Sequence, residues 1–574
     1  MEDYKLLPYG ISNYVQIRRD NRYWVDKTMY LERMERAGNF LFLIRPRRFG
    51  KSLFLSMMES YYDMASKDDF DWLFGDTYVG SHPTPERNSY QVLRLDFSKP
   101  GGSVDNLETN VNGYLDVMYG NFVTKYAKYY PEEYLTNYKA LKTTSDRVNY
   151  VHQMFYTYRV KSYLIVDEYD NFTNNVLNQH GEAVYHAMTH AEGFYRDLFK
   201  KFKGSFDRIL MMGVSPVTMD DVTSGYNIAT ALTLEKNFNE MLGFSDDEVR
   251  QIIRYYNEVG AFSLDEEATL EAMRPWYDGY CFSEYPKVVG HHVFNTDMVL
   301  YYLQSFLMNG GEPVEKVDPN TKTDYAKLDR VVRLDQIDGD RKGVLLEIAQ
   351  QGYTYGNVKR SFPANQLTDP NMFKSLLFYY GMVTIRGMRG ANCILGIPNN
   401  NVREQYFNYL LVEYNKIKRI DLSLLTTSFD DAALDGHWRE MMEYICRQYH
   451  DTTSVRSLIE GERNLQGFMN ALLTLNPYYL TCPEVELNHG YCDFFLMPDL
   501  QRYPDIRHSY IIELKYLPMT ATVAEAEKQW REAEAQIRGY AEGPVVRQMT
   551  QGTTLHLLIA QLKGYDLLRL DQVE

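Results

Sequence analysis

The chain has 574 residues, of which 45% are hydrophobic and 24% are charged, an ordinary globular balance. This length exceeds what a single hydrophobic core supports and predicts three or four domains. The net charge of −16 argues against a protein coated in nucleic acid over its whole surface, although binding in a local basic groove follows the local field rather than the sum.

Cysteine usage and hydropathy predict the compartment. The five cysteines are scattered without a CxxC pair, so we expect a reducing compartment and no disulfide framework. The first ten residues lack the basic start and apolar core of a signal peptide, and no apolar run approaches the ~18 residues of a membrane span. We therefore expect a soluble, cytoplasmic protein without a membrane partner.

The first chemical motif, NFLFLIRPRRFGKSLFLSMM, occupies residues 39–58. An apolar run, a loop ending in Gly-Lys-Ser and a stretch at helical spacing are how a phosphate-binding loop is built. Lys51 would neutralise the β and γ phosphate oxygens, the Ser52 hydroxyl would ligate Mg²⁺, and Gly50 would let the backbone approach closely. Arg45 stands where the usual pattern has its first glycine, and a chance strand-to-helix turn is the alternative interpretation.

Other residues of this loop are also candidates for nucleotide binding. Phe49 and Leu53 flank Gly-Lys-Ser, where backbone N–H groups and the helix N-terminus would hold the phosphates. Arg47 and Arg48 would touch the γ-phosphate or a neighbouring element, and a solvated basic turn is the alternative.

A second motif, SYLIVDEYD, spans residues 162–170 and reads as a buried strand ending in two acids. Ligands of open α/β sheets bind at the carboxyl ends of the strands. Asp167 would hold Mg²⁺ through water, and Glu168 would polarise the attacking water, which favours a hydrolase over a kinase. A strand ending in solvated acids is the alternative when this motif is taken alone.

Further segments complete a mostly parallel sheet with helices on both faces. Residues 90–97 form a strand between the two motifs, as expected when the phosphate strand and the acidic strand are not neighbours. Residues 207–217 form another strand, at whose tip Ser215 would sense the γ-phosphate or would simply be a turn residue before Pro216. Residues 182–204 have the apolar spacing of one helix.

The motifs LPYGISNY, YWVDKT, RPRRFGKS, LIVDEYD and GVSPV, in this order, resemble the AAA-ATPase-like family of bacterial proteins over roughly the first 290 residues. The resemblance implies that ATP and Mg²⁺ are the cofactors and that Arg45 is a family variant of the loop. Met212 departs from the threonine that is common before GVSP in the family.

The middle of the chain predicts a helical lid followed by smaller elements. Residues 243–259 open with a capping box and continue as an amphipathic helix, and residues 294–306 form another helix of the lid. Residues 307–335 are polar and turn-rich, as expected of a linker. Beyond them, residues 345–352 read as a strand, and a helix leads into two strands, which predicts a winged-helix-like unit; residues 399–418 read as a connecting helix.

The last 120 residues carry a different constellation. Glu513 and Lys515 lie two apart on the buried strand SYIIELKYL and therefore point to one face. Asp493 starts the preceding strand, where a hairpin can bring it alongside. Two carboxylates near one point would bind Mg²⁺, and Lys515 would orient or help deprotonate the attacking water. A surface hairpin with a Glu/Lys salt bridge is the alternative.

The order helix, strand, strand, strand, helix, strand over about residues 455–570 resembles the PD-(D/E)xK nuclease superfamily. The resemblance implies that Asp493, Glu513 and Lys515 are catalytic, with both acids binding metal. It also implies that Glu462, on the first helix, is a further metal ligand.

The same resemblance implies that Gln536 and Tyr540 on the following helix position DNA or the lysine. Tyr491 and Cys492 depart from the arginine and small residue common before the metal-binding aspartate. Residues 451–574 contain 11 Lys and Arg against 17 Asp and Glu, a net charge of −6. Such a domain grips DNA poorly unaided, so another domain or a partner is expected to help.

Taken together, the sequence predicts an α/β protein. The expected domains are a P-loop AAA-ATPase-like domain at 1–235, a helical lid at 236–310, a linker and winged-helix-like region at 311–420 and a PD-(D/E)xK nuclease-like domain at 421–574. The expected function is ATP hydrolysis coupled to Mg²⁺-dependent cleavage of nucleic acid, with DNA as the expected substrate, in DNA processing or defence. A nucleotide-controlled signalling or scaffold protein whose nuclease fold binds without cutting is the alternative, and a homo-oligomer is a candidate assembly.

Overall fold

The structure, a computed structural model, describes residues 4–573 with the exception of residues 102–105, 190–192, 218–228, 286–289, 314, 320–340, 364–365, 367–368, 407, 409–419, 453–461, 488–489 and 501. The chain divides into two compact units, which are described separately. Unit 1 comprises Met1–Val344 with Tyr353–Asn401, and unit 2 comprises Leu345–Gly352 with Val402–Glu574. The predicted division into four domains, with its boundaries, stays a prediction.

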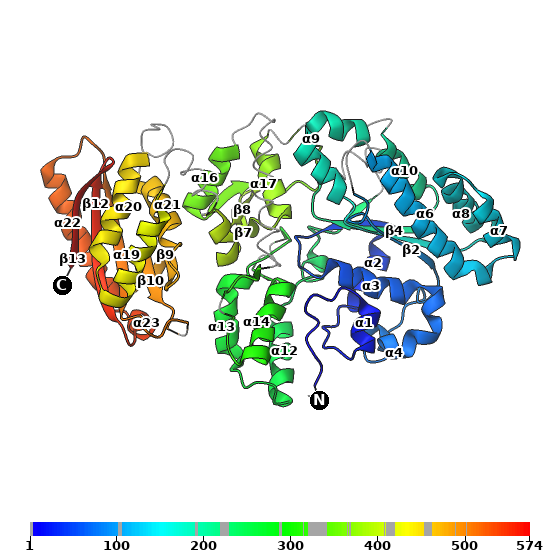
Figure 1. The fold of residues 1–574 in the computed structure, drawn as a ribbon, viewed down its shortest axis with the longest axis horizontal. Helices are drawn as coiled ribbons and strands as arrows, with labels where there is room; N and C mark the ends of the chain where they lie inside the picture. Colours follow the sequence, from blue (N-terminus) through cyan, green and yellow to red (C-terminus); the bar gives the residue numbers. More distant parts are fainter. Residues whose placement is uncertain are drawn as a thin grey trace. The chain divides into compact units, whose positions relative to one another are not determined.

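Unit 1 is built around a five-stranded parallel sheet in the order β2-β3-β4-β1-β5 (Figure 1). All six residues of β3 are buried, as expected of a parallel strand covered on both faces. The predicted parallel P-loop sheet is therefore confirmed. Its strands are β1 (Phe40–Ile44), β2 (Gln91–Asp96), β3 (Ser162–Asp167), β4 (Arg208–Gly213) and β5 (Thr230–Ala231).

The position of β2 differs from what its place in the sequence suggests. β1 and β3 are not neighbours, as expected, but β4 rather than β2 separates them, and β2 lies at the edge. The chain runs from β2 through three helices and returns as β3 parallel to β2, so the two strands pair with each other. These helices are α6 (Leu107–Tyr126), α7 (Glu133–Ala140) and α8 (Thr144–Tyr158), with a 3₁₀ turn, η3 (Ala127–Tyr129), between the first two.

The single helix predicted at residues 182–204 is wrong, since two helices cover this stretch. They are α9 (Asn171–Thr189) and α10 (Phe194–Lys203). Gly193 precedes α10 in an extended conformation, and a Cβ there would come within 2.1 Å of the Met188 carbonyl oxygen. The tight turn at this glycine interrupts a helical apolar pattern that is otherwise continuous in the sequence.

Three helices form the predicted lid. They are α12 (Asp246–Glu258), α13 (Glu266–Tyr277) and α14 (Thr296–Asn309). The capping box is present, because the Ser245 hydroxyl accepts from the Glu248 N–H and the Glu248 carboxylate accepts from the Ser245 N–H. Of the predicted linker at residues 307–335, residues 320–335 lie outside the described part of the chain.

Unit 1 also contains a small antiparallel sheet in the order β6-β8-β7. Asp369 caps α17 (Pro370–Tyr379), whose first residue is proline, and α17 leads into β7 (Thr384–Arg389) and β8 (Asn392–Gly396). β6 (Tyr353–Gly356) completes the sheet. The helix and hairpin of the predicted winged-helix-like unit are therefore confirmed.

The strand predicted at residues 345–352 is wrong, because this stretch lies in α16 (Arg341–Gln351). Leu345 and Ile348 are buried three residues apart, which is helical spacing. Most of the connecting helix predicted at residues 399–418 lies outside the described residues.

Unit 2 contains a mixed five-stranded sheet in the order β13-β12-β11-β10-β9. The strands are β9 (Tyr479–Leu487), β10 (Gly490–Pro498), β11 (His508–Leu517), β12 (Thr554–Lys563) and β13 (Asp566–Val573). The single strand expected at the end of the predicted order is divided by a turn at Gly564, where φ is +60°, so β12 and β13 pair as a hairpin. The nuclease-like α/β arrangement is otherwise confirmed.

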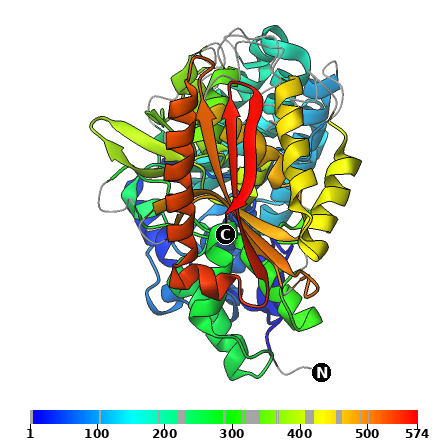
Figure 2. The ribbon, with the colours of Figure 1, turned by 90° about the vertical axis from the view of Figure 1, so that its left-hand side faces the viewer.

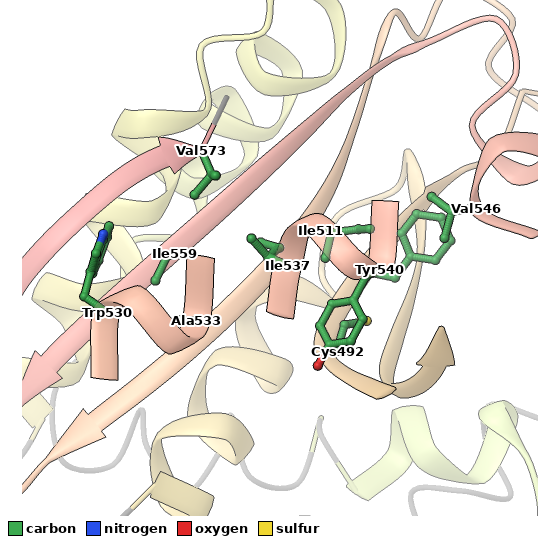
Figure 3. Close-up of a cluster of buried hydrophobic side chains, with 10 residues drawn as sticks. Cys492, Ile511, Trp530, Ala533, Ile537, Tyr540, Val546, Ile559 and Val573 are labelled. Carbon is green, nitrogen blue, oxygen red and sulfur yellow. The ribbon is translucent and has the colours of Figure 1, made fainter. Parts of the chain in front are cut away.

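Helices cover both faces of this sheet (Figure 2). α22 (Val523–Ala541) lies on one face, where Trp530, Ala533, Ile537 and Tyr540 pack against buried residues of the strands (Figure 3). α19 (Leu422–Asp435) and α20 (Trp438–Thr452) lie on the other. Two further helices, α21 (Glu462–Leu473) and α23 (Pro544–Met549), complete the unit.

Two negative expectations concern the described part of the chain alone. The four cysteines whose side chains it includes are buried and free of disulfide bonds. Every helix within it falls short of the length and apolar character that a membrane span requires.

Candidate functional site

The loop after β1 has the geometry of a phosphate-binding loop. β1 ends at Ile44, and α3 (Lys51–Tyr62) begins directly after Gly50. Gly50 adopts φ +83°, a left-handed conformation that strains any residue with a Cβ. The first N–H groups of α3 therefore face the loop from the carboxyl end of a central parallel strand, as predicted.

Lys51 lies inside this loop. Its ammonium group donates hydrogen bonds to the carbonyl oxygens of Arg45, at 3.0 Å, and Pro46, at 2.8 Å. Burial lowers the pKa of Lys51, and the charges of Glu168 and Asp167 act in the opposite direction. An anionic ligand in the loop would offset the same burial, because it would supply the countercharge that the two carbonyls lack.

Arg45 explains why the loop lacks its first glycine. The guanidinium is fully buried and donates to the carbonyl oxygens of Ile44, Thr233 and Phe238 at 3.0, 3.1 and 2.7 Å. It also stacks on the ring of Phe282, with its central carbon 4.2 Å from the ring centre. Arg45 therefore fixes the base of the loop to residues 233–238. Sequence reasoning missed this structural role, because the partners are backbone atoms.

The neighbouring arginines are placed differently. The guanidinium of Arg48 forms an ion pair with Asp297 at 3.0 Å, so it binds the lid helix α14. Arg47 lines the cavity described below. Phe49 is buried with its ring edge-on to Tyr280 and Phe282, so only its backbone is available to a ligand.

The end of β3 brings Asp167 to Ser52. The Ser52 hydroxyl hydrogen-bonds the carboxylate, and a guanidinium nitrogen of Arg94 lies 3.5 Å from Oδ2. Burial raises the pKa of Asp167 despite these partners. Its Oδ1 atom is buried and accepts no hydrogen bond from any described residue. A buried acceptor beside the Ser52 hydroxyl fits a site for Mg²⁺ held partly through water.

Glu168 directly follows and turns toward the loop. Its backbone has φ +47°, which is uncommon for a residue with a side chain. The carboxylate accepts a hydrogen bond from the Asn171 amide and lines the same cavity as Lys51 and Ser52. The two acids of the motif thus have separate environments, since Asp167 meets the loop serine and Glu168 faces open space.

The third acid, Asp170, was not assigned a role from the sequence. Its carboxylate accepts from the backbone N–H groups of Val214, at 3.2 Å, and Ser215, at 2.6 Å, and from Asn174. Burial raises its pKa. Asp170 therefore ties the end of β3 to the turn after β4. The signal was its place three residues after Asp167, at the close of the acidic motif.

Ser215 is held in that turn. It is buried, and its hydroxyl accepts from the Val217 N–H at 3.3 Å. The side chain of Tyr380 also hydrogen-bonds Ser215. Ser215 is not among the described residues that line the cavity, so contact with a phosphate would require this turn to move.

A cavity of about 400 Å³ adjoins the loop. Its polar and charged lining includes Lys27, Arg47, Arg48, Lys51, Ser52, Glu168 and Asp297. Residues from two N-terminal segments, 8–12 and 23–27, line it together with α3 and the lid, and its apolar side chains include Ile11, Trp24, Met57 and Leu300. A lining that combines charged and apolar groups suits a ligand with a planar base and a charged tail. The sequence did not predict that the N-terminal motifs would contribute to this lining.

Ion pairs fasten the lid to this cavity. Lys27 donates to Glu248 at 2.7 Å and to the carbonyl oxygen of Glu240 at 2.9 Å. Arg48 and Asp297 form a second link, described above. On another side of the loop, Gly381, with φ +75°, follows α17, and a Cβ there would come within 2.9 Å of the Pro46 ring. The loop therefore touches both the lid and the small β6-β8-β7 sheet.

In unit 2, strand pairing brings together the predicted nuclease residues. Phe494 of β10 pairs with Ile512 of β11 in antiparallel register, so the next step places Asp493 opposite Glu513. The Asp493 Oδ2 atom accepts from the Leu514 N–H at 2.7 Å. The ammonium group of Lys515 lies 2.8 Å from a Glu513 oxygen. The hairpin thus aligns the three side chains as the sequence predicted.

The electrostatics of this pair fit a divalent cation. Burial, followed by the charge of Glu513, raises the pKa of Asp493 to about 7. Hydrogen bonds from Leu514 and Gln466 and the charge of Lys515 act in the opposite direction. Two adjacent carboxylates that resist joint ionisation are stabilised when a cation lies between them.

Gln466 was missed from the sequence. Its amide on α21 donates a hydrogen bond to Oδ1 of Asp493. Glu462, the predicted further ligand, is the first residue of α21, and its side chain lies outside the described part. The spacing of four residues between them was the available signal. Among the described side chains, no group of three or more His, Cys, Asp and Glu is arranged to hold a metal.

The residues implied by the nuclease resemblance are only partly placed. Tyr540 lies near the acids, since the charges of Glu513 and Asp493 contribute, after burial, to raising its pKa to about 12. Cys492 is buried beside Tyr540 in the apolar cluster (Figure 3). Gln536 is exposed, and the side chain of Tyr491 lies outside the described residues.

Comparison with known proteins finds family matches over the two parts of the chain that contain these sites. Residues 8–223 match the family model described as a predicted AAA-ATPase, and residues 460–571 match the model of the PD-(D/E)XK nuclease superfamily. An uncharacterised protein encoded in the vnfD 5′ region of Azotobacter chroococcum mcd 1 is 25% identical over 403 residues, which cover 64% of this chain and 68% of that protein.

Two solved structures are similar to this chain at low scores. Cdc6p of Pyrobaculum aerophilum is 9% identical, covers 67% of this chain and 92% of its own, and has a TM-score of 0.26. The ORC2 protein of Aeropyrum pernix, solved in ADPNP-ADP complexes, is 10% identical, with 72% and 98% covered and a TM-score of 0.30. Nothing about the function of this chain rests on scores this low. By its two family matches, the chain carries an AAA-ATPase-like domain at residues 8–223 and a PD-(D/E)XK nuclease superfamily domain at residues 460–571.

Proposed function

We propose that unit 1 binds and hydrolyses ATP with Mg²⁺. The observation that carries this proposal is the cavity beside the loop, which Lys51, Ser52 and Glu168 line together with apolar side chains such as Trp24 and Met57. Adenine would pack against apolar side chains, and the triphosphate would reach the loop.

The residues of the site would divide the work. Lys51 would exchange the carbonyl oxygens of Arg45 and Pro46 for phosphate oxygens, and Gly50 and Leu53 would present backbone N–H groups. Ser52 and Asp167 would hold Mg²⁺, which supplies positive charge beside the phosphates. Glu168 would accept a proton from the attacking water and orient it.

ATPase measurements on the full chain test this assignment. Lys51→Ala is expected to abolish ATP binding, whereas Glu168→Gln should retain binding and lower the turnover rate by about 100-fold or more. Lys67→Ala, an exposed lysine outside the cavity, is the matched control. Unchanged turnover in Glu168→Gln would remove that residue from the mechanism.

We further propose that unit 2 is a metal-dependent nuclease, acting on DNA in DNA processing or defence within a bacterial cytoplasm. The observation that carries this proposal is the strand register that sets Asp493 opposite Glu513, with the Lys515 ammonium group 2.8 Å from a Glu513 oxygen. Asp493, Glu513 and Glu462 would hold Mg²⁺, which supplies charge to stabilise the phosphodiester under attack. Lys515, positioned by Glu513, would orient the attacking water.

Plasmid cleavage in Mg²⁺ tests the nuclease. Glu513→Gln and Lys515→Ala should each reduce cleavage by at least about 100-fold, since each removes a group that contacts the reacting centre. Lys528→Ala on the exposed face of α22 is the control. Cleavage that survives both substitutions would arise from a contaminant or from another site.

A second candidate is a nucleotide-controlled scaffold whose nuclease fold binds without cutting, in which homo-oligomers are one candidate assembly. Cys492, which replaces the small residue next to Asp493, is packed into the apolar cluster rather than facing a substrate. Nucleic-acid binding by the full chain, without cleavage in either Mg²⁺ or Mn²⁺, would favour this function.

A further inference from the structure

Residues 121–161 differ in composition from the rest of the chain. They contain seven Lys and Arg against three Asp and Glu, a net charge of +4, whereas the whole chain has a net charge of −16. They also contain eight tyrosines. The segment covers the end of α6, η3, α7 and α8, which lie together at one edge of unit 1 beyond β2 (Figure 1).

Several of these tyrosines form a connected series of rings. The ring of Tyr158 meets Tyr130 edge-on at 5.3 Å, Tyr130 stacks on Tyr134 at 4.1 Å, and Tyr134 stacks on Tyr150 at 5.7 Å. Tyr130 and Tyr134 are buried, and the hydroxyl of Tyr130 is anchored by Gln91 at 2.8 Å. The inner rings thus give the outer one a rigid support.

Three tyrosines of the segment face solvent instead. Tyr156 is 88% exposed, Tyr158 43% and Tyr129 39%. The described part of the chain has seven aromatic side chains that are at least 36% exposed, and three of these seven lie within 30 residues. Single exposed aromatic residues need no explanation, but such a grouping on a small basic region does.

Cations accompany these exposed rings. The ammonium group of Lys128 lies 5.0 Å from the centre of the Tyr129 ring. Arg159, exposed and left-handed at φ +52°, directly follows Tyr158 at the end of α8. Tyr130 links two of the exposed rings, because its own ring meets Tyr158 and it directly follows Tyr129 in the chain. Tyr156, two residues before Tyr158 on α8, points to another side of that helix. The tyrosine patch is therefore defined by Lys128, Tyr129, Tyr158 and Arg159.

We propose that the tyrosine patch binds single-stranded nucleic acid. Unpaired bases stack on exposed aromatic rings without regard to sequence, while lysine and arginine bind the phosphates between them. A duplex hides the faces of its bases, so it offers the rings nothing to stack on. The inference rests on the proposed nuclease function and adds to it a nucleic-acid-binding surface in unit 1. Residues 451–574 have a net charge of −6, which does not favour binding of phosphates.

The test uses the full chain without nucleotide and with EDTA, so binding is measured where cleavage cannot occur. Fluorescence anisotropy follows a labelled oligothymidylate of about 20 nucleotides, an oligouridylate of the same length and a matched duplex. Tyr129→Ala combined with Tyr158→Ala removes the two exposed rings of the patch and leaves the supporting rings of Tyr130 and Tyr134 in place. Trp72→Ala, an equally exposed aromatic residue elsewhere in unit 1, is the matched control.

The expected result is that both single strands bind more tightly than the duplex. The double variant should raise their dissociation constants by about fivefold or more for each ring removed, while Trp72→Ala changes nothing. Phenylalanine at both positions should restore binding, because it keeps the stacking surface. Lys128→Ala should reduce the slope of log K against log salt by about 0.7 for one lost phosphate contact.

Several results would overturn the patch while leaving the proposed nuclease intact. One is unchanged oligonucleotide binding in the double variant, with cleavage retained in Mg²⁺. Another is that the duplex binds as tightly as the single strands and the alanine variants leave the dissociation constants unchanged. That result would indicate electrostatic attraction to phosphates without stacking of bases on the rings. Conversely, loss of cleavage in Glu513→Gln with unchanged oligonucleotide binding would show that the patch binds nucleic acid independently of the nuclease site.

Discussion

The two candidate sites both hold acids, which lie at and after the end of β3 in unit 1 and within β10 and β11 in unit 2, and the partners of these acids differ. Around the phosphate-binding loop, Asp167 has Ser52 and Arg94 beside it, and Asp170 accepts two backbone N–H groups. In unit 2, Asp493 lies opposite Glu513 and holds a raised pKa of about 7. The first site is assembled before a cation arrives, whereas the second keeps an electrostatic conflict that a cation would resolve.

The largest expected effect is a pH dependence of stability that follows from the two adjacent carboxylates, Asp493 and Glu513. Asp493 has a folded pKa of about 7, and an unfolded aspartate titrates near about 4. The folded state therefore binds the extra proton between these values, and stability falls as pH rises through this window, by up to about 4 kcal/mol. Thermal unfolding measured from about pH 5 to about pH 8 should show this fall for unit 2.

Two controls sharpen this prediction. Asp493→Asn should flatten the pH profile, and Mg²⁺ added above about pH 7 should restore stability to the wild type alone. A profile that is equally steep in the variant would assign the pH dependence to another group.

The second prediction concerns Arg45, the buried charged residue at the base of the phosphate-binding loop in unit 1. Arg45→Ala leaves three buried carbonyl oxygens without their donor and should destabilise unit 1 by about 3 kcal/mol or more. Chemical denaturation measures the loss, and Arg36→Ala on the exposed end of α2 (Met29–Ala37) should change stability by less than about 0.5 kcal/mol. Arg45→Gly, which restores the usual loop glycine, should be no more stable than the alanine variant. Wild-type stability in Arg45→Gly would contradict the proposal that Arg45 stabilises unit 1 by fixing the base of the loop to residues 233–238.

A smaller effect is expected at Gln466. Removing its amide in Gln466→Ala takes a hydrogen bond from ionised Asp493 and should raise the pKa of that carboxyl further, by about one unit. The midpoint of the pH–stability profile should shift upward accordingly, whereas Gln551→Ala in an exposed turn should leave it in place. An unmoved midpoint would mean that the Gln466 amide has no effect on the pKa of Asp493.

The smallest effect is expected at Asp170. Asp170→Asn keeps one acceptor for the turn after β4 and should destabilise unit 1 by only about 1 kcal/mol, measured by denaturation beside the exposed control Asp68→Asn. Because Asp170 holds the turn that contains Ser215, the Michaelis constant for ATP is expected to change as well. Expressed as a free energy, this change should exceed the loss of stability. A stability loss as large as that of Arg45→Ala would show that unit 1 depends equally on Arg45 and Asp170.

How much the sequence predicted depends on whether a residue acts through local or distant partners. The Gly-Lys-Ser loop, the acid pair at residues 167 and 168 and the Glu-x-Lys strand follow from local period and spacing, and the structure has them on the expected elements. The roles of Arg45 and Asp170 depend on backbone atoms far away or in another strand, which no spacing rule reveals. Gln466 lay within reach of a helical-spacing argument and was overlooked.

The errors in secondary structure have a similar origin. Residues 345–352 are a short apolar run that period alone cannot assign, and burial of Leu345 and Ile348 decides for a helix. The division of residues 182–204 into two helices depends on the close approach at Gly193. The place of β2 at the sheet edge is a property of topology, which the order of motifs along the chain does not contain.

The contact between Gly381 and Pro46 has a mechanical consequence. Since Gly381 has no side chain, the Pro46 ring of the phosphate-binding loop lies directly against the turn leading into β7. A loop that shifts when phosphate enters or leaves would push on this turn through the Pro46 ring, with no side chain at residue 381 to absorb the displacement. The hairpin of β7 and β8, which follows this turn, would be the next element to feel the shift.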